Sequence, residues 1–151
     1  MRYALTIACM IVLAPLSFGQ TSSAASREDN ADKAAFEAVC SACHPSNMVT
    51  DLRSEPEWKE TVEHMVAIGA TGTDEQFSRL MRYLLRNLTK VNVNTATAAQ
   101  LAPVLDVSEA TAKALVDYRT EHGPFKTMED LKKAPGLTAS KLENRKNRIV
   151  F

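Results

Sequence analysis

Apolar residues recur at helical spacing through most of this chain of 151 residues, and no stretch shows the strict alternation of a half-buried strand. The clearest stripe places six apolar side chains at positions i, +3, +4, +7, +8 and +11: Phe77, Leu80, Met81, Leu84, Leu85 and Leu88. This spacing predicts a helix over 74–88 that buries one face and begins after the capping residue Thr73. The pattern therefore predicts an all-α protein.

Two further helices are predicted before this stripe. The first covers 29–40 and has its apolar side chains on one side. The second covers 54–68, because Ser54 and Glu57 have the spacing of a capping box and Gly69 follows the last apolar position.

Four shorter helices are predicted between residue 91 and the end of the sequence. A residue type that favours helix starts precedes each of them: Asn94 or Thr95, Ser108, Thr127 and Thr138. The first ends near residue 104, the second at His122 and the fourth near residue 147. Two helix pairs joined by tight turns form a compact all-α unit.

The first residues of the chain have the pattern of a secretory signal peptide. Arg2 supplies the positive charge, and residues 3–16 form an apolar segment. Ser17 and Gly19 are small residues at the two positions that a signal peptidase reads, which predicts cleavage before Gln20. The sequence therefore predicts a signal peptide over 1–19 and a periplasmic protein without stable membrane insertion after cleavage. A retained membrane anchor is the alternative, because the length of the apolar segment is near the minimum for a helix that spans a membrane.

A polar segment rich in serine and alanine follows the predicted cleavage site. We expect residues 20–29 to be a disordered leader, with cleavage after Ala24 or Ala25 as an alternative. Cys9 lies within the predicted signal peptide, so the mature protein would keep two of the three cysteines.

The charge balance changes near residue 90, where we place a domain boundary. Residues 27–90 hold 8 basic and 11 acidic side chains, a net charge of −3. Residues 91–151 hold 9 basic and 7 acidic side chains, a net charge of +2. The sequence thus predicts one small domain over 30–90 and a second over 91–151.

The two remaining cysteines belong to the motif Cys40-Ser41-Ala42-Cys43-His44, which is the attachment signature of a c-type haem. In this chemistry the thiols of Cys40 and Cys43 add across the two porphyrin vinyl groups, and His44 ligates the iron. The alternatives are a redox dithiol, which is typical of a βαβ setting, and half of a zinc site, which needs a second ligand pair. The motif favours one covalently bound haem c.

Two further spacings resemble a cytochrome family. Trp58-x6-Met65-x3-Gly69 and Tyr-Leu-Leu-x-Asn at 83–87 are similar to small monohaem cytochromes associated with periplasmic dehydrogenases. A first helix that ends in the haem motif and a strongly striped last helix resemble the class I cytochrome c arrangement. The resemblance implies that a methionine beyond the haem motif closes the iron.

Helical periodicity independently favours Met65 as that sixth ligand. Trp58, Val62 and Met65 lie on one helix face, so a haem-facing Met65 would share its wall with the indole. The alternatives are an open sixth position or one of three other side chains: His64, Met48 and Met81. Arg53 is a candidate partner for a haem propionate, with a solvent-exposed role as the alternative.

Three segments of the second half resemble the tandem helix-hairpin-helix domain of ComEA-type proteins, which hold DNA outside the cytoplasmic membrane. They are VNVNTA at 91–96, YRTEHGPF at 118–125 and LKKAPGL at 131–137, and the likeness covers 91–151. The resemblance implies a compact helical domain. Relatives of this fold also dock proteins, so the fold alone does not decide between a nucleic-acid and a protein partner.

The hairpins depart from the family pattern of glycine, hydrophobic residue and glycine, in which bare amides hold a phosphate. The first hairpin, residues 106–108, reads Asp-Val-Ser, and the second, residues 136–138, reads Gly-Leu-Thr. The second hairpin lies among clustered lysines and arginines. These side chains either favour the binding of a polyanion or form a solvated helix face. The candidate phosphate contacts are Gly136, Thr138, Lys141 and Arg145.

These observations favour a periplasmic electron carrier with one haem c, whose second domain docks a periplasmic redox protein or dehydrogenase. Such a protein is not an enzyme, since peroxidase-like activity needs an open sixth position. The alternative is an exported DNA-binding protein of the ComEA type, with duplex DNA as partner and a mainly structural haem.

Overall fold

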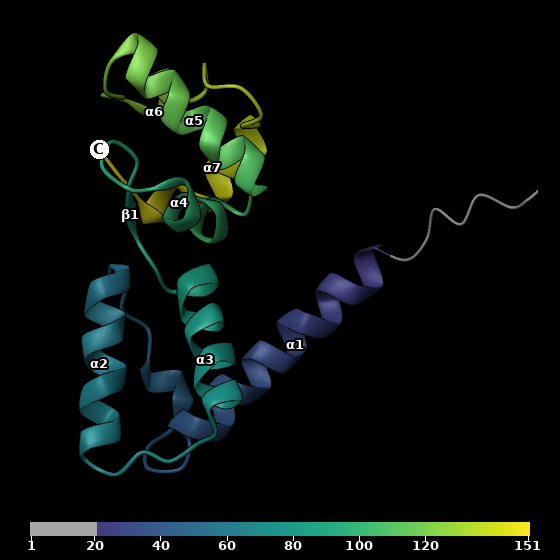
Figure 1. Cartoon of the computed structure of the whole chain (residues 1–151), viewed down its shortest axis with the longest axis vertical. Helices are drawn as coiled ribbons and strands as arrows, with labels where there is room; N and C mark the ends of the chain where they lie inside the picture. The colour runs from purple at the N-terminus through teal and green to yellow at the C-terminus, as the bar shows by residue number, and fades with distance from the viewer. Residues whose placement is uncertain (1–20) are drawn as a thin grey trace, which may run out of the picture.

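The computed structural model describes residues 21–151. Two helical units follow one another, an N-terminal unit over residues 21–88 and a C-terminal unit over residues 91–151 (Figure 1). The predicted signal peptide, residues 1–19 with its cysteine, lies outside the described residues. Within the described part, no helix combines the length and the apolarity that are needed to cross a membrane.

The N-terminal unit consists of three α-helices and one 3-10 turn: α1 (Thr21–Cys40), η1 (Ser46–Met48), α2 (Glu55–Ala67) and α3 (Asp74–Asn87). The main helix packing is between α1 and α3, with α2 beside α3 (Figure 1). Five buried apolar side chains form the core of this unit: Phe36, Val39, Trp58, Leu80 and Leu84. A core of this size is small, and small domains commonly need a cofactor or another constraint to be stable.

The helices α2 and α3 begin where the sequence predicts. The Glu57 carboxylate accepts hydrogen bonds from Ser54 N and Oγ at 2.6 and 2.7 Å, as a capping box requires. Thr73 Oγ1 accepts a hydrogen bond from Gln76 N at 3.2 Å at the start of α3. The turn after α2 contains Gly69 with a φ of +113°, a conformation that favours glycine.

The helix α1 begins at Thr21, whereas the sequence predicts a disordered leader over 20–29. Residues 21–29 are helical instead, because alanine, glutamate and arginine in this segment support a helix and the same helix packs on α3. Asp29 of α1 also forms an ion pair with Arg86 near the end of α3.

A buried ion-pair cluster holds α1 against α3. The side chain of Asp32 is 3 % exposed and accepts hydrogen bonds from Arg82 Nε and Nη2 at 3.0–3.3 Å. Arg79 Nη1 lies 3.7 Å from the same carboxylate. A buried carboxylate needs such partners, because removing them would leave an uncompensated charge.

The C-terminal unit contains four α-helices, one 3-10 turn and two short strands: β1 (Val91–Asn92), α4 (Ala98–Leu105), α5 (Glu109–His122), α6 (Met128–Leu131), α7 (Ala139–Arg145), η2 (Lys146–Arg148) and β2 (Ile149–Val150). Its core is larger, with twelve buried side chains that include Val93, Leu101, Leu115 and Leu142. The caps predicted at the starts of α5, α6 and α7 are all present.

The start of α4 differs from the sequence prediction. Thr97 caps the helix, in place of the predicted Asn94 or Thr95. Asn94 instead exchanges two hydrogen bonds of 2.8 Å with the backbone of Phe125, and thereby joins two turns of the unit. Asn92 Oδ1 accepts two hydrogen bonds from the backbone that follows it, one from Asn94 N and one from Thr95 N.

A short parallel strand pair closes the C-terminal unit, although the sequence predicts only helices. Val91 pairs with Ile149 and Asn92 with Val150. Two residues are too few for an alternating pattern, so periodicity gives no signal for these strands. The described protein is nevertheless mostly helical, as predicted.

Replacement of Gly136 by alanine should destabilise the C-terminal unit. Gly136 has a φ of +80°, and a Cβ there would lie 2.7 Å from Thr111 Cγ2. The backbone conformation and the overlap together should lower the free energy of unfolding by about 2–4 kcal/mol. Gly123→Ala is the matched control, since its φ is +90° and no atom lies within 4 Å of the added Cβ. If chemical denaturation shows that Gly136→Ala and Gly123→Ala lose the same free energy of unfolding, the overlap with Thr111 contributes nothing.

Candidate functional site

The Cys-x-x-Cys-His motif begins at the last residue of α1. Cys40 ends the helix, and His44 N donates a 3.4 Å hydrogen bond to Cys40 O across the following turn. Cys40 is half-buried, Cys43 is exposed, and both are free thiols. Burial raises the pKa of the Cys40 thiol. The helix end thus presents both thiols and the imidazole on one short segment.

Two adjoining cavities open beside this motif, with volumes of about 170 and 200 Å³. Five residues line both of them: Cys40, His44, Val62, Met65 and Leu80. The two cavities share these walls, and we call them together the Cys–His crevice. Its other walls are mainly apolar and include Phe36, Trp58 and Phe77.

The imidazole of His44 has a backbone carbonyl beside its Nδ1 atom. Its Nδ1 lies 3.3 Å from Pro45 O. A neutral imidazole that donates its hydrogen from Nδ1 to a carbonyl has its lone pair on Nε2. Metal-binding histidines commonly have this second contact, because it fixes the tautomer and the ring orientation.

The helix α2 supplies the opposite wall of the Cys–His crevice. Met65 lines both of its cavities, and the buried Trp58 lines one of them. Trp58 Nε1 donates a 2.9 Å hydrogen bond to Leu88 O, which fixes the indole beside the cavity. The thioether of Met65 and the indole therefore share a wall, as the helical spacing predicts.

The other candidate axial ligands are placed differently from Met65. His64 is exposed and lines neither of the two cavities. Met81 packs against the core and also lines neither cavity. Met48 borders the smaller cavity, but its side chain is 70 % exposed.

Arg53 lies at the rim of the same crevice. Its guanidinium carbon is 5.4 Å from the centre of the Trp58 ring, and its Nη2 is 3.5 Å from Asp51 Oδ2. Its backbone is fixed by two hydrogen bonds, from Arg53 N to Leu88 O and from Lys90 N to Arg53 O. The side chain is therefore a cation in a defined place beside an apolar cavity.

These residues fit a covalently bound haem. The motif offers two thiols and an oriented imidazole, α2 offers a thioether, and the walls between them are apolar. Ile68, which lines the larger cavity, is 68 % exposed. An apolar ring system in the crevice would cover such side chains, which otherwise contact solvent.

The two hairpins of the C-terminal unit are adjacent. The first contains Asp106, which is left-handed with a φ of 55° and ends α4. Lys141 Nζ, which follows the second hairpin, donates a 2.6 Å hydrogen bond to Asp106 O. Thr138 Oγ1 accepts a hydrogen bond from Lys141 N and so caps α7. The carboxylate of Asp106 occupies the first hairpin, where the family pattern has a bare glycine.

Most of the basic side chains near the second hairpin have partners within the chain. Three lysines form exposed ion pairs one helical turn away: Lys132 with Glu129, Lys133 with Asp130, and Lys146 with Glu143. Arg145 and Arg148 are turned toward the N-terminal unit and donate hydrogen bonds to Arg86 O. Exposed pairs of this kind are weak and exchange readily, whereas the two arginine contacts connect the units.

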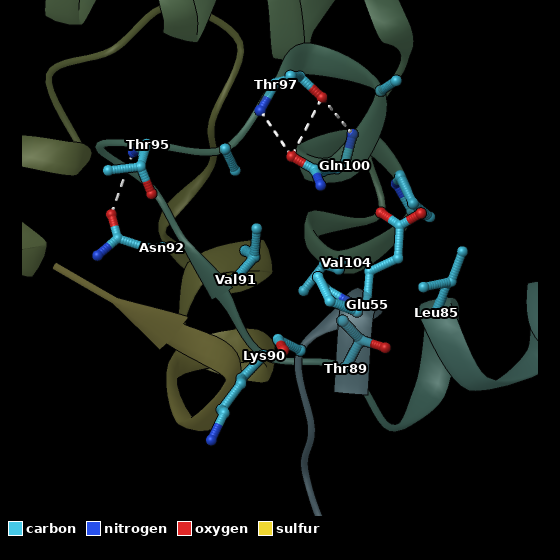
Figure 2. A pocket seen from close by; sticks show the side chains of 15 residues that line it. Glu55, Leu85, Thr89, Lys90, Val91, Asn92, Thr95, Thr97, Gln100 and Val104 are labelled. Atoms are coloured by element: carbon cyan, nitrogen blue, oxygen red, sulfur yellow. Dashed lines mark hydrogen bonds between the residues drawn. The ribbon is translucent and has the colours of Figure 1, made fainter. Parts of the chain in front are cut away.

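A cleft of about 510 Å³ lies between the two units (Figure 2). Glu55 enters it from the start of α2, and Gln100 from α4. Two polar side chains of the cleft have partners: Gln100 Oε1 accepts hydrogen bonds from Thr97, and Glu55 pairs with Lys59 at 2.7 Å. That pairing holds the pKa of Glu55 below its ordinary value. The cleft is thus part of the joint between the units.

Sequence comparisons concern the C-terminal unit. Residues 86–150 match the family described as "Helix-hairpin-helix motif". The mouse protein named "Endonuclease/exonuclease/phosphatase family domain-containing protein 1" is 47 % identical over 60 residues, which are 40 % of this chain and 10 % of that protein. The chain thus spans about a tenth of the length of these vertebrate relatives, and the enzyme class in their name is not transferred to it.

Two bacterial proteins are also similar to this chain. "ComE operon protein 1" of Bacillus subtilis is 39 % identical over 60 residues, which cover 40 % of this chain and 29 % of that protein. An uncharacterised protein of Haemophilus influenzae is 38 % identical over 63 residues, or 41 % of this chain and 56 % of that protein. No solved structure is a significant match. Residues 86–150 therefore form a helix-hairpin-helix domain.

Proposed function

We propose that the protein carries single electrons through one c-type haem, with the helix-hairpin-helix domain as its docking module. The observation that supports this proposal is that two thiols and two candidate iron ligands line one apolar crevice: Cys40, Cys43, His44 and Met65. A haem bound there would take up and release one electron at its iron, with a potential above that of bis-histidine ligation.

The residues of the chain would each have a separate task. Cys40 and Cys43 would anchor the porphyrin through thioether bonds, and His44 would approach the iron through Nε2. Met65, which lines both cavities, would be the second side chain to hold the iron, through its thioether. Trp58 and the other apolar walls would surround the porphyrin, and Arg53 would be available to a propionate at the rim.

Export is part of this proposal. Covalent haem attachment to such a motif takes place outside the bacterial cytoplasm, which agrees with the predicted signal peptide and a periplasmic location. The exposed surface of the helix-hairpin-helix domain would dock a periplasmic redox protein or dehydrogenase.

The test is to produce the protein in a bacterial periplasm with a c-type haem maturation system. We expect haem that stays attached on a denaturing gel and a spectrum that cycles reversibly in a one-electron redox titration. Absence of covalent haem would refute the proposal. Covalent haem that does not change oxidation state within the physiological range would refute electron transfer and leave a structural haem.

A second candidate function is DNA binding outside the cytoplasm, as in ComEA-type proteins. The comparisons support this candidate better than electron transfer, because the family match falls on residues 86–150 and one similar protein is named "ComE operon protein 1". Lys141 lies between the two hairpins and is exposed, so its ammonium can reach a phosphate. Gly136 and Thr138 would then present the backbone at the second hairpin.

DNA binding predicts a steep dependence on salt. Titration of labelled duplex DNA at several salt concentrations should give a log–log slope of about −0.9 for each phosphate contact. Lys141→Gln should reduce that slope by about one contact. Lys59→Gln, on α2 of the N-terminal unit, removes the same charge outside the domain and should leave the slope unchanged. Absence of binding at low salt would exclude this candidate.

A further inference from the structure

The two units are fastened at the C-terminal end of α3 by two arginines from the helix-hairpin-helix domain. Arg145 Nη1 donates a 2.9 Å hydrogen bond to Arg86 O, and Arg148 Nη1 donates to the same oxygen. The side chain of Arg145 is only 19 % exposed. One backbone carbonyl of the N-terminal unit therefore has two cationic donors from the C-terminal unit.

A helix end explains why two cations can share one acceptor. The last carbonyls of a helix have no partner within it, and they form the negative end of the helix dipole. Burial lowers the pKa of Arg148, and the like charge of the nearby Arg145 lowers it further. The helix end opposes this repulsion, and Asp106 lies 4.0 Å from Arg145 on the other side.

The same end of α3 also holds residues of the Cys–His crevice. Leu88 O, just after α3, accepts hydrogen bonds from Trp58 Nε1 and from Arg53 N. Leu80 and Leu84, farther back on α3, line the crevice directly. A change in the position of the α3 end would therefore move crevice residues on two elements.

We propose that Arg145 and Arg148 are positioning residues for the haem crevice. By capping α3, they make the helix-hairpin-helix domain a support of the N-terminal unit, in addition to any docking role. This inference rests on the proposed binding of haem.

The test uses the haem-loaded full chain and two double variants with equal loss of charge. R145Q/R148Q removes both donors to Arg86 O, whereas K132Q/K146Q removes two cations that pair only within the C-terminal unit. The readouts are thermal loss of the absorption band of methionine-ligated ferric haem, and the rate of limited proteolysis in the connection at residues 88–91.

In R145Q/R148Q, we expect the midpoint of band loss to fall by about 4–8 °C and cleavage of the connection to become about ten-fold faster. K132Q/K146Q should match the wild type in both measurements. R145K/R148K, which keeps the cations, should recover part of the loss. If R145Q/R148Q does not accumulate, R148Q alone is measured by the same criteria.

The outcomes separate this inference from the proposed function. A wild-type protein without covalent haem overturns the proposed function and this inference together. Normal haem ligation in the wild type, with R145Q/R148Q melting and being cleaved like K132Q/K146Q, overturns the positioning role alone.

Discussion

The double variant C40A/C43A is expected to lose covalent haem completely. Both thiols belong to the only Cys-x-x-Cys-His motif of the sequence, and no other cysteine lies in the described residues. Without thioether bonds, a haem could bind only reversibly through its iron ligands. Haem staining of a denaturing gel should therefore change from positive to negative.

This variant should also weaken the N-terminal unit selectively. The core of the N-terminal unit has five buried apolar side chains, against twelve in the C-terminal unit. The stability of the N-terminal unit should therefore depend more on a haem bound in the crevice. Circular dichroism should show an early loss of helix in C40A/C43A, followed by melting of the helix-hairpin-helix domain as in the wild type.

The third cysteine provides the control. Cys9→Ala lies in the predicted signal peptide and should leave haem attachment unchanged. Cys43→Ala alone should keep one thioether bond, and with it a reduced yield of attached haem. Haem that survives denaturation in C40A/C43A would show that the motif is not the attachment site.

Helix starts were predictable because their signals are local. Ser54, Thr73, Ser108, Thr127 and Thr138 each cap the helix that the sequence assigns to them. A capping bond joins residues two or three positions apart, so its residue types can be identified without knowledge of the fold.

The start of α4 was not predictable for the opposite reason. Asn94 has the side chain of a capping residue, but its amide binds the backbone of Phe125, which is 31 positions away. The residues that connect the two units are likewise far apart in sequence, since Arg145 and Arg148 lie 59 and 62 positions after Arg86. Arginines in a basic segment show no local pattern that identifies such a contact.

The candidate ligands were predictable to different degrees. The chemistry of covalent haem attachment requires Cys40, Cys43 and His44 to lie close together in sequence, so their spacing alone identifies them. The position of Met65 beside Trp58 follows from helical periodicity, and both side chains line the crevice. The rim position of Arg53 depends on backbone pairing with residues 88–90, for which the sequence contains no signal.

The structure also sets a condition on DNA binding. Arg145, a candidate phosphate contact, donates its hydrogen bond to Arg86 O within the chain. A phosphate that takes the same Nη1 hydrogen must break this contact, so DNA binding through Arg145 and fastening of the units compete. DNA binding through Lys141 would break a less important contact, because the partner of Lys141 is the exposed carbonyl of Asp106 within the same domain.

Met65→Ala is expected to open the sixth position of the haem iron. Loss of the thioether should convert a six-coordinate low-spin spectrum to a five-coordinate high-spin one, and should allow carbon monoxide to bind the reduced protein. The potential should fall by on the order of 0.1 V, a fraction of the range of about 0.8 V that axial ligands control. Absorption spectra of both oxidation states and a redox titration measure these changes.

His64→Ala is the matched control for this prediction. His64 is the neighbour of Met65 on α2, but it is exposed and lies outside both cavities of the crevice. H64A should therefore keep the spectrum and the potential of the wild type. An unchanged spectrum in M65A would exclude Met65 as the ligand, and Met48→Ala would then test the other methionine that borders the crevice. Because Met48 lies in the loop just after His44, its ligation would require that loop to cross the porphyrin plane, whereas α2 already brings Met65 to the crevice wall.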